Sequence, residues 1–359
     1  MVVSAPSLLL ALLALSSTIH AILNECVHII ILWWTMIPQS TPSTQCVVME
    51  DLCERLKGMR RKEASSHYRI PNYLAAEWQA RLTANDSMYD SDSEMPIPNE
   101  EVSELNEQWR EKICEWCYRV VDHFDYNREV VNVAMSYLDR YLAQCTVNRR
   151  IYQLVGVTSL YLATKLFEGN HLHLPSLVGI SRGYFHAEHI LAMEETMLHA
   201  LSWHLHPPTS RAFCWEMMRL VSPDISSRIR HDVGNLAIFL TELSVCDFYF
   251  VTRKPSSIAI ASIINAIELY GHKPAGDGSR LTGPKKIEPK YKIHFLQNVV
   301  RIGIDIADDD EIIECYERLR EMYIEGGYTP TPEDEDDVLP DTANIKKRKR
   351  DDSDTILSA

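Results

Sequence analysis

The hydrophobic positions of this chain follow helical spacing almost without a break from about Val102 to Gly271. Spacing of this kind is typical of helices that bury one face against a core. The pattern therefore predicts an all-α protein. The expected helices cover 102–124, 128–143, 148–166, 186–201, 209–221, 225–245 and 255–270, and 311–325 forms a last amphipathic helix.

One of these segments, from Leu154 to Lys165, carries apolar side chains on every side. A helix of this kind is expected to be buried all round, at the centre of its domain. Gly156, Ser159 and Ala163 place small side chains on one of its faces, where a second helix can approach closely. Lys165 ends the segment, where a cation complements the negative end of the helix dipole.

Pro207 and Pro208 divide the helical region into two blocks with a similar internal order. In each block a helix is followed by a short polar turn and then by an almost wholly apolar helix. The first block has 130–142 before 150–166, and the second has 233–245 before 255–270. This parallel predicts two tandem all-helical repeats.

The segments outside the repeats differ from them in composition. Residues 1–48 are apolar and have two interpretations, a signal-like or membrane-anchoring segment and an extension before the true start of the protein. No Lys or Arg precedes Arg55, which favours the second interpretation, with Met49 as the expected native start. Residues 49–101 are a charged segment that ends in an acidic linker. A Gly/Pro/Lys-rich loop is expected at 271–289, and 326–359 is expected to be a disordered acidic tail with a basic cluster.

Composition narrows the classes of function. The 359 residues are 46% hydrophobic, which is ordinary for a globular chain, and their formal net charge is -14. An acidic protein is a poor match for a phosphate backbone, so direct nucleic-acid binding is not expected. The 9 cysteines have no regular spacing, and several lie in apolar helical runs. They are expected to be reduced core residues of an intracellular protein.

Histidine pairs suggest a metal hydrolase as the enzyme hypothesis. No carboxylate or cysteine follows them at ligand spacing, and the chain has no phosphate-binding loop, nucleophile elbow or HExxH motif. We therefore expect no metal, no cofactor and no intrinsic enzyme activity. The histidine pairs are His171 and His173, His186 and His189, and His204 and His206.

A series of short motifs crosses the first block. They are WREKICEW at 109–116, YLDRYL at 137–142, QLVG at 153–156, ATK at 163–165, ME at 193–194, and LSW at 201–203 followed by PPT at 207–209. Together they resemble the cyclin box of eukaryotic cyclins. The second block is similar to the cyclin C-terminal domain, chiefly at 243–250 and 254–256. The resemblance implies two tandem cyclin-fold helical domains of about five helices each, an N-terminal cyclin box at 102–207 and a C-terminal cyclin-like domain at 208–325.

By this resemblance the chain is expected to be a cyclin. Such a protein is a non-catalytic regulatory subunit that binds and activates a cyclin-dependent Ser/Thr protein kinase in cell-cycle control. The alternative is a cyclin-fold scaffold in transcription, such as a general transcription factor or a pocket-protein-like protein, without kinase activation. A DNA-binding scaffold should show a basic face on the repeats, and residues 102–325 have no obvious one.

The resemblance also assigns roles to individual residues. Arg110 and Asp139 are expected to form a buried ion pair that clamps the first two helices of the box. The expected kinase contact consists of two charged residues and three apolar neighbours. Solvated surface charges are the alternative for both charged pairs. The kinase-contact residues are Lys165, Glu194, Leu166, Phe167 and Leu198.

A shallow hydrophobic groove that docks short substrate motifs is another feature of the family. The matching positions are Trp109, Ile113, Trp116 and Gln153. Lys112 and Arg119 depart from the family pattern, which has an apolar and an acidic residue there. A helix face that is packed internally or solvated is therefore an equal alternative.

The tail carries two candidate signals. The basic cluster of Lys346, Lys347, Arg348, Lys349 and Arg350 is expected to be a nuclear localisation signal, read by an acidic groove of an import receptor. Thr329 and Thr331 each precede a proline and are candidate phosphosites that predict turnover through ubiquitin-ligase machinery; a plain spacer is the alternative. The expected location is the nucleus and the cytoplasm, without functional membrane insertion.

Overall fold

The computed structural model describes residues 44–75, 78–80, 106–181, 184–270, 287–304, 306 and 310–325. These residues are largely helical, and no β-strand occurs among them. Within the same ranges no helix is both long and apolar enough to cross a membrane. The predicted all-α fold is confirmed.

The helices from Glu107 to Ala200 form the first of two helical domains, here called the first fold. It is built around one buried helix, α6 (Arg149–Phe167). Every residue of α6 from Leu154 to Thr164 is buried, as the apolar pattern predicted. The helix starts at Asn148, whose side chain accepts a hydrogen bond of 2.9 Å from the Ile151 amide and so caps the first turn. The surrounding helices are α4 (Glu107–Phe124), α5 (Glu129–Leu142), α7 (Leu174–Ile180) and α8 (Ala187–Ala200). Helices α4, α5 and α8 contact α6 directly.

Small residues on α6 admit two neighbouring helices. A Cβ added at Gly156 would lie 3.0 Å from two side-chain carbons of Ile113, so α4 approaches α6 closely at this glycine. Ser159 is buried one turn later, and its Oγ lies 4.0 Å from the sulfur of Met197 in α8. The expected close approach is therefore confirmed at Gly156, whereas Ser159 faces a different helix from the one that meets this glycine.

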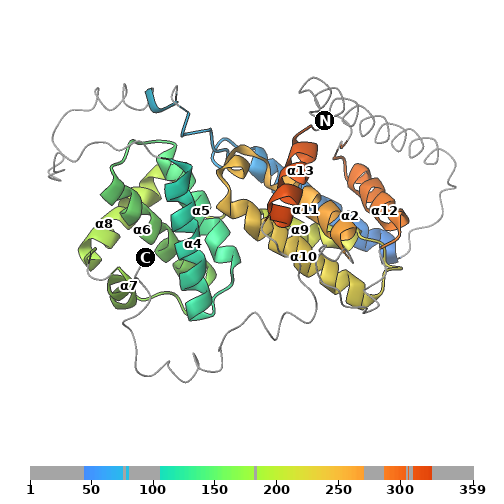
Figure 1. Cartoon of the computed structure of the whole chain (residues 1–359), viewed down its shortest axis with the longest axis horizontal. Coiled ribbons are helices and arrows are strands. Elements are labelled where there is room, and N and C mark those ends of the chain that lie inside the picture. The colour runs from blue at the N-terminus through green and yellow to red at the C-terminus, as the bar shows by residue number, and fades with distance from the viewer. Residues whose placement is uncertain are drawn as a thin grey trace, which may run out of the picture.

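The helices from Ser210 to Glu325 form the second fold, which is also built around one buried helix. Its central helix α11 (Pro255–Leu269) is buried from Ser256 to Ile267, and α10 (Ser227–Cys246) packs along it as α5 packs along α6. The two folds lie side by side in Figure 1, and each has five α-helices. The remaining elements are α9 (Ser210–Met217), the 3₁₀-helices η1 (Met218–Leu220) and η2 (Phe248–Thr252), α12 (Pro289–Arg301) and α13 (Asp310–Glu325).

Helix α12 is the main element that the hydrophobic pattern did not predict. It begins at Pro289, the last residue of the expected loop at 271–289. Proline suits a first helical position because no amide hydrogen is needed there. Phe295, Asn298 and Val299 of α12 are buried, and the helix is clearly amphipathic, so its periodic pattern was present in the sequence and was hidden by the neighbouring Gly/Pro/Lys-rich stretch.

Helix α2 (Thr44–Ala64) comes first in the chain but packs on the second fold, where it appears in blue behind α9 and α11 in Figure 1. Leu52 and Leu56 are buried in the same hydrophobic cluster as Phe213 of α9. Near its end, the Glu63 carboxylate accepts hydrogen bonds from the amide (3.0 Å) and the hydroxyl (2.6 Å) of Ser256, at the start of α11. A carboxylate at a helix N-terminus also complements the helix dipole. Helix α2 begins at Thr44, within the apolar N-terminal stretch 1–48.

Candidate functional site

Lys165 and Glu194, the two charged residues expected to contact a kinase, bind each other. Lys165 lies in the last turn of α6 and Glu194 in the middle of α8, and the Lys165 Nζ is 2.9 Å from a Glu194 carboxylate oxygen. The Glu194 side chain is 9% exposed, whereas that of Lys165 is 44% exposed. The hydrogen bond to Glu194 raises the pKa of Lys165, so the amine stays charged. A buried carboxylate thus holds a surface cation in one position.

Apolar residues follow Lys165 at the end of α6 and flank Glu194 at helical spacing on α8. Leu166 and Phe167 are 40% and 39% exposed, unusually high for large hydrophobic residues at the end of a buried helix. Leu198 is partly buried against the core of the first fold. Leu191 is 45% exposed and stands three residues before Glu194, on the same face of α8. Leu191 was not among the predicted contact residues, although its spacing to Glu194 and Leu198 follows the helical period.

Arg110 and Asp139 form the buried ion pair that the resemblance implied. Arg110 of α4 donates two parallel hydrogen bonds of 2.9 Å, from Nε and Nη2, to the two carboxylate oxygens of Asp139 in α5. Arg110 is 4% exposed and Asp139 2%. Burial alone would lower the pKa of Arg110, but the Asp139 carboxylate more than offsets this and leaves that pKa above its ordinary value.

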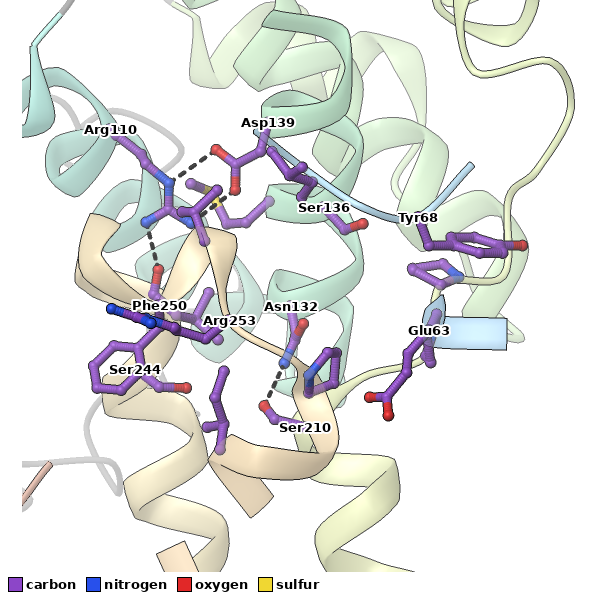
Figure 2. A pocket seen from close by; sticks show the side chains of 18 residues that line it. Glu63, Tyr68, Arg110, Asn132, Ser136, Asp139, Ser210, Ser244, Phe250 and Arg253 are labelled. Carbon is purple, nitrogen blue, oxygen red and sulfur yellow. Dashed lines mark hydrogen bonds and ion pairs between the residues drawn. The ribbon is translucent and has the colours of Figure 1, made fainter. Parts of the chain in front are cut away.

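The same arginine reaches the second fold. Its Nη1 donates a hydrogen bond of 2.7 Å to the backbone oxygen of Val245, near the end of α10. Figure 2 shows the Arg110 guanidinium between the carboxylate of Asp139 and this backbone oxygen. The ion pair therefore joins α4, α5 and α10, and not only the first two helices of the box.

Tyr73 adds a third side chain to this ion pair. Its role was not predicted, because it lies in the charged N-terminal segment. Its hydroxyl donates a hydrogen bond of 2.8 Å to Asp139, and its ring packs edge-on against Phe248 of η2. Burial, followed by the nearby Asp139 charge, raises the pKa of Tyr73, which keeps the hydroxyl protonated and able to donate. No periodic signal surrounds Tyr73, so its contact with Asp139 was not predictable from the hydrophobic pattern.

A small cavity of about 100 Å³ lies at this junction between the folds (Figure 2). Beside it, Asn132 of α5 donates a hydrogen bond of 3.2 Å to Ser210 of α9. Farther along the junction, Glu242 of α10 binds Arg128 of the first fold at 2.7 Å and Arg211 of α9 at 2.6 Å. Polar contacts thus hold the two folds in one arrangement.

The candidate groove residues lie on α4 and α6. Ile113 packs on Gly156, as described above, and the Trp109 ring lies 5.6 Å from that of Tyr152. Trp109, Ile113, Trp116 and Gln153 are all partly buried. Their role in docking substrate motifs stays a prediction.

The histidines take part in local structure. His186 and His189 cap the start of α8, since the His189 ring accepts a hydrogen bond of 3.3 Å from the His186 amide. The His204 ring stacks at 3.8 Å on that of His67, from the segment after α2. Lys346 to Arg350, Thr329 and Thr331 lie outside the described residues.

Comparison with known proteins identifies the first fold. The family model of the cyclin N-terminal domain matches residues 78–206. These residues belong to the cyclin N-terminal domain family. The match includes both charged pairs, Arg110 with Asp139 and Lys165 with Glu194. It begins at Trp78, whose indole nitrogen donates a hydrogen bond of 3.0 Å to the Ala143 carbonyl at the end of α5.

Several plant cyclins are similar to this chain. G2/mitotic-specific cyclin S13-6 of Glycine max is 33% identical over 164 residues, which cover 45% of this chain and 35% of the relative. G2/mitotic-specific cyclin S13-7 of Glycine max is 32% identical over 164 residues, which cover 45% of this chain and 61% of the relative. Cyclin-B1-1 of Oryza sativa subsp. japonica is 31% identical over 165 residues, which cover 45% of this chain and 36% of the relative. The matched regions therefore span 35% to 61% of the length of these relatives.

Among solved structures, a viral cyclin from herpesvirus saimiri aligns with 62% of this chain and 87% of its own, with a TM-score of 0.49 and 13% sequence identity.

Proposed function

We propose that this cyclin-box protein binds and activates a cyclin-dependent Ser/Thr protein kinase, and that it acts in the G2 and mitotic phases for which its relatives are named. The observation that carries the proposal is the ion pair of Lys165 and Glu194 at the surface of the box, next to exposed Leu166 and Phe167. A fixed charge beside exposed apolar side chains is suited to binding another protein.

The geometry suggests how the contact works. An ammonium group has three donors, and Glu194 takes one of those of Lys165. The other two N–H groups of Lys165 donate hydrogen bonds to backbone carbonyls of a partner helix. Leu166 and Phe167 bury their exposed area against the same helix. A kinase regulatory helix held in this way keeps the kinase's own Lys–Glu pair and metal-binding Asp aligned. In this proposal the cyclin box positions the kinase helix and supplies no catalytic group.

The test is co-purification of the kinase with the tagged full chain. The double variant Lys165→Ala/Glu194→Ala should lose the kinase band and the co-purifying Ser/Thr protein kinase activity, with an unchanged helical circular dichroism spectrum. A matched control is Lys57→Ala/Glu54→Ala, which removes another surface Lys–Glu pair, 2.8 Å apart on α2. Wild-type recovery of kinase by the first variant would overturn the site. A wild-type chain that recovers no kinase would favour the transcription scaffold.

A nuclear location is part of the proposal. The five basic residues from Lys346 to Arg350 are its support, because a cluster of this size in an acidic tail suits the acidic groove of an import receptor. Replacing all five by alanine should move a C-terminally tagged chain from the nucleus to the cytoplasm. Unchanged nuclear signal would remove this role from the cluster.

Turnover through the tail is the last part of the proposal. Phosphorylation of Thr329 and Thr331 would add roughly -1.5 to -2 charge at each site and create a ligand for a basic pocket of a ubiquitin ligase. A Thr329→Ala/Thr331→Ala chain should then have a longer half-life in a pulse-chase experiment. An unchanged half-life would leave the tail as a spacer.

A further inference from the structure

Two cysteines from different folds lie in contact. The Cys114 thiol of α4 donates a hydrogen bond to the sulfur of Cys246, the last residue of α10, with the sulfur atoms 3.6 Å apart. The two residues are 132 positions apart in the sequence, so only the docking of the folds brings them together. A disulfide bond needs the sulfurs at about 2.05 Å, which a small side-chain movement supplies.

The surroundings differ for the two sulfurs. Cys114 is fully buried, whereas Cys246 is partly open to solvent. The hydrogen bond from Cys114 lowers the pKa of the Cys246 thiol; burial opposes this, and the nearby Arg110 guanidinium adds to the lowering. The same hydrogen bond, with burial, raises the pKa of Cys114. Cys246 is therefore the more accessible sulfur and the better nucleophile of the two.

Cys117 is the rival partner for Cys114, because the two stand three positions apart in the sequence CEWC. Both lie within the regular helix α4. Residues at this spacing have Cβ atoms about 5–6 Å apart, beyond the roughly 3.5–4.5 Å that a disulfide requires. The helix thus disfavours the local pair, and the contact across the folds is the one with suitable geometry.

We propose that Cys114 and Cys246 are a peroxide-sensitive thiol pair that forms a reversible disulfide between the cyclin box and the C-terminal fold. The proposal stands on this contact and does not depend on the identity of the kinase.

The chemistry balances with hydrogen peroxide as the oxidant. The Cys246 thiolate attacks one peroxide oxygen, the O–O bond breaks, and hydroxide leaves, so Cys246 becomes a sulfenic acid. The Cys114 thiol then loses its proton and attacks the Cys246 sulfur, the S–O bond breaks, and the hydroxide takes up that proton and leaves as water. In sum, two thiols and one peroxide give one disulfide and two waters. A dithiol reductant reverses the bond.

The bond would close beside the Arg110 clamp. Arg110 already binds the backbone oxygen of Val245, the neighbour of Cys246. A covalent link at this point fixes α4 against α10 and constrains the unfolded chain through a long loop. Oxidation should therefore stabilise the two folds as a single unit.

The direct test is peptide mapping of the full chain after a hydrogen peroxide titration and alkylation of the remaining thiols. Trypsin leaves Cys114 and Cys117 together in 113–119 and Cys246 alone in 231–253. We expect a linked pair of these two peptides that dithiothreitol separates. Recovery of Cys246 only as an alkylated thiol or an oxygenated acid would overturn the proposal.

Matched variants show whether Cys114 or Cys117 is bonded to Cys246. The link should persist in Cys117→Ala and disappear in Cys114→Ala and in Cys246→Ser. Loss of the link in Cys117→Ala with retention in Cys114→Ala would overturn the assignment. In wild type, oxidation should raise the melting temperature by at least about 5 °C, and dithiothreitol should reverse it. Oxidised Cys246→Ser should show no such rise.

Discussion

Arg110 binds Asp139 through two parallel hydrogen bonds of 2.9 Å, with both side chains buried. Buried pairs of this kind are costly to break, because removing one partner leaves the other charge without compensation. Here the arginine also binds Val245 of the second fold, and Tyr73 binds the aspartate from the N-terminal segment. The stability of the cyclin box is therefore coupled to the docking of two other parts of the chain.

The first prediction concerns this pair. Arg110→Ala should lower the free energy of unfolding by about 3–5 kcal/mol, because Asp139 is left buried and unpaired. Chemical denaturation of the purified chain measures the change. Arg119→Ala removes an exposed arginine from the same helix and should change stability by less than about 0.5 kcal/mol. Equal stabilities of the two variants would contradict the clamp.

The second prediction concerns the close approach of α4 and α6. Gly156→Ala should destabilise the chain by about 1–3 kcal/mol, because the new Cβ would lie 3.0 Å from two carbons of Ile113. Gly58→Ala in α2 meets no atom within 4 Å and should stabilise by roughly 0.5–1 kcal/mol. Adding Ile113→Ala removes both contacts, so the double variant should be less destabilised than the sum of the two single variants. Simple additivity would rule out the steric explanation.

The third prediction concerns the apolar neighbours of Lys165 and rests on the proposed function. Leu166→Ala/Phe167→Ala should weaken kinase association at least about tenfold, while the melting temperature changes little, because both side chains are about two-fifths exposed. Trp215→Ala is the control, since Trp215 of α9 is a 69% exposed aromatic residue in the other fold. Kinase binding that fell equally in both variants would speak against a localised contact.

The fourth prediction is a pH dependence at the docking of α2. Burial raises the pKa of Glu63 above its ordinary value of 4.5, although the Ser256 hydrogen bonds oppose this. A carboxyl group with a raised pKa in the folded state binds its proton more tightly there than in the unfolded chain. Its contribution to stability is therefore fully present below the unfolded-state pKa and is lost as pH rises through the folded-state pKa.

Glu63→Gln removes this titration and keeps the shape of the side chain. The stability of wild type relative to Glu63→Gln should fall as pH rises from 4 toward neutrality, as urea denaturation at several pH values would show. Glu54→Gln, at an exposed position of the same helix, is a control of opposite sign: the hydrogen bond from Lys57 lowers the pKa of Glu54, so the stability of wild type relative to this variant should not fall over the same pH range. A wild-type stability advantage that grew with pH would contradict the raised pKa of Glu63.

Local patterns in the sequence determined most of the helices, the burial of the central helix and the doubled architecture. The apolar run of Leu154 to Lys165 requires burial whatever surrounds it, since an exposed helix of that composition would be unstable in water. The motif resemblance brought together Arg110 with Asp139 and Lys165 with Glu194, which the structure places in direct contact.

Tertiary structure alone decided which surfaces meet. Helical periodicity shows which face of α2 is apolar, but it does not show that this face packs on α9 of the second fold, although the first fold comes next in the sequence. The contacts of Arg110 with Val245, of Tyr73 with Asp139 and of Cys114 with Cys246 each join residues far apart in sequence. Such contacts depend on how whole helices dock, and docking is set by the summed burial of many side chains rather than by any local pattern.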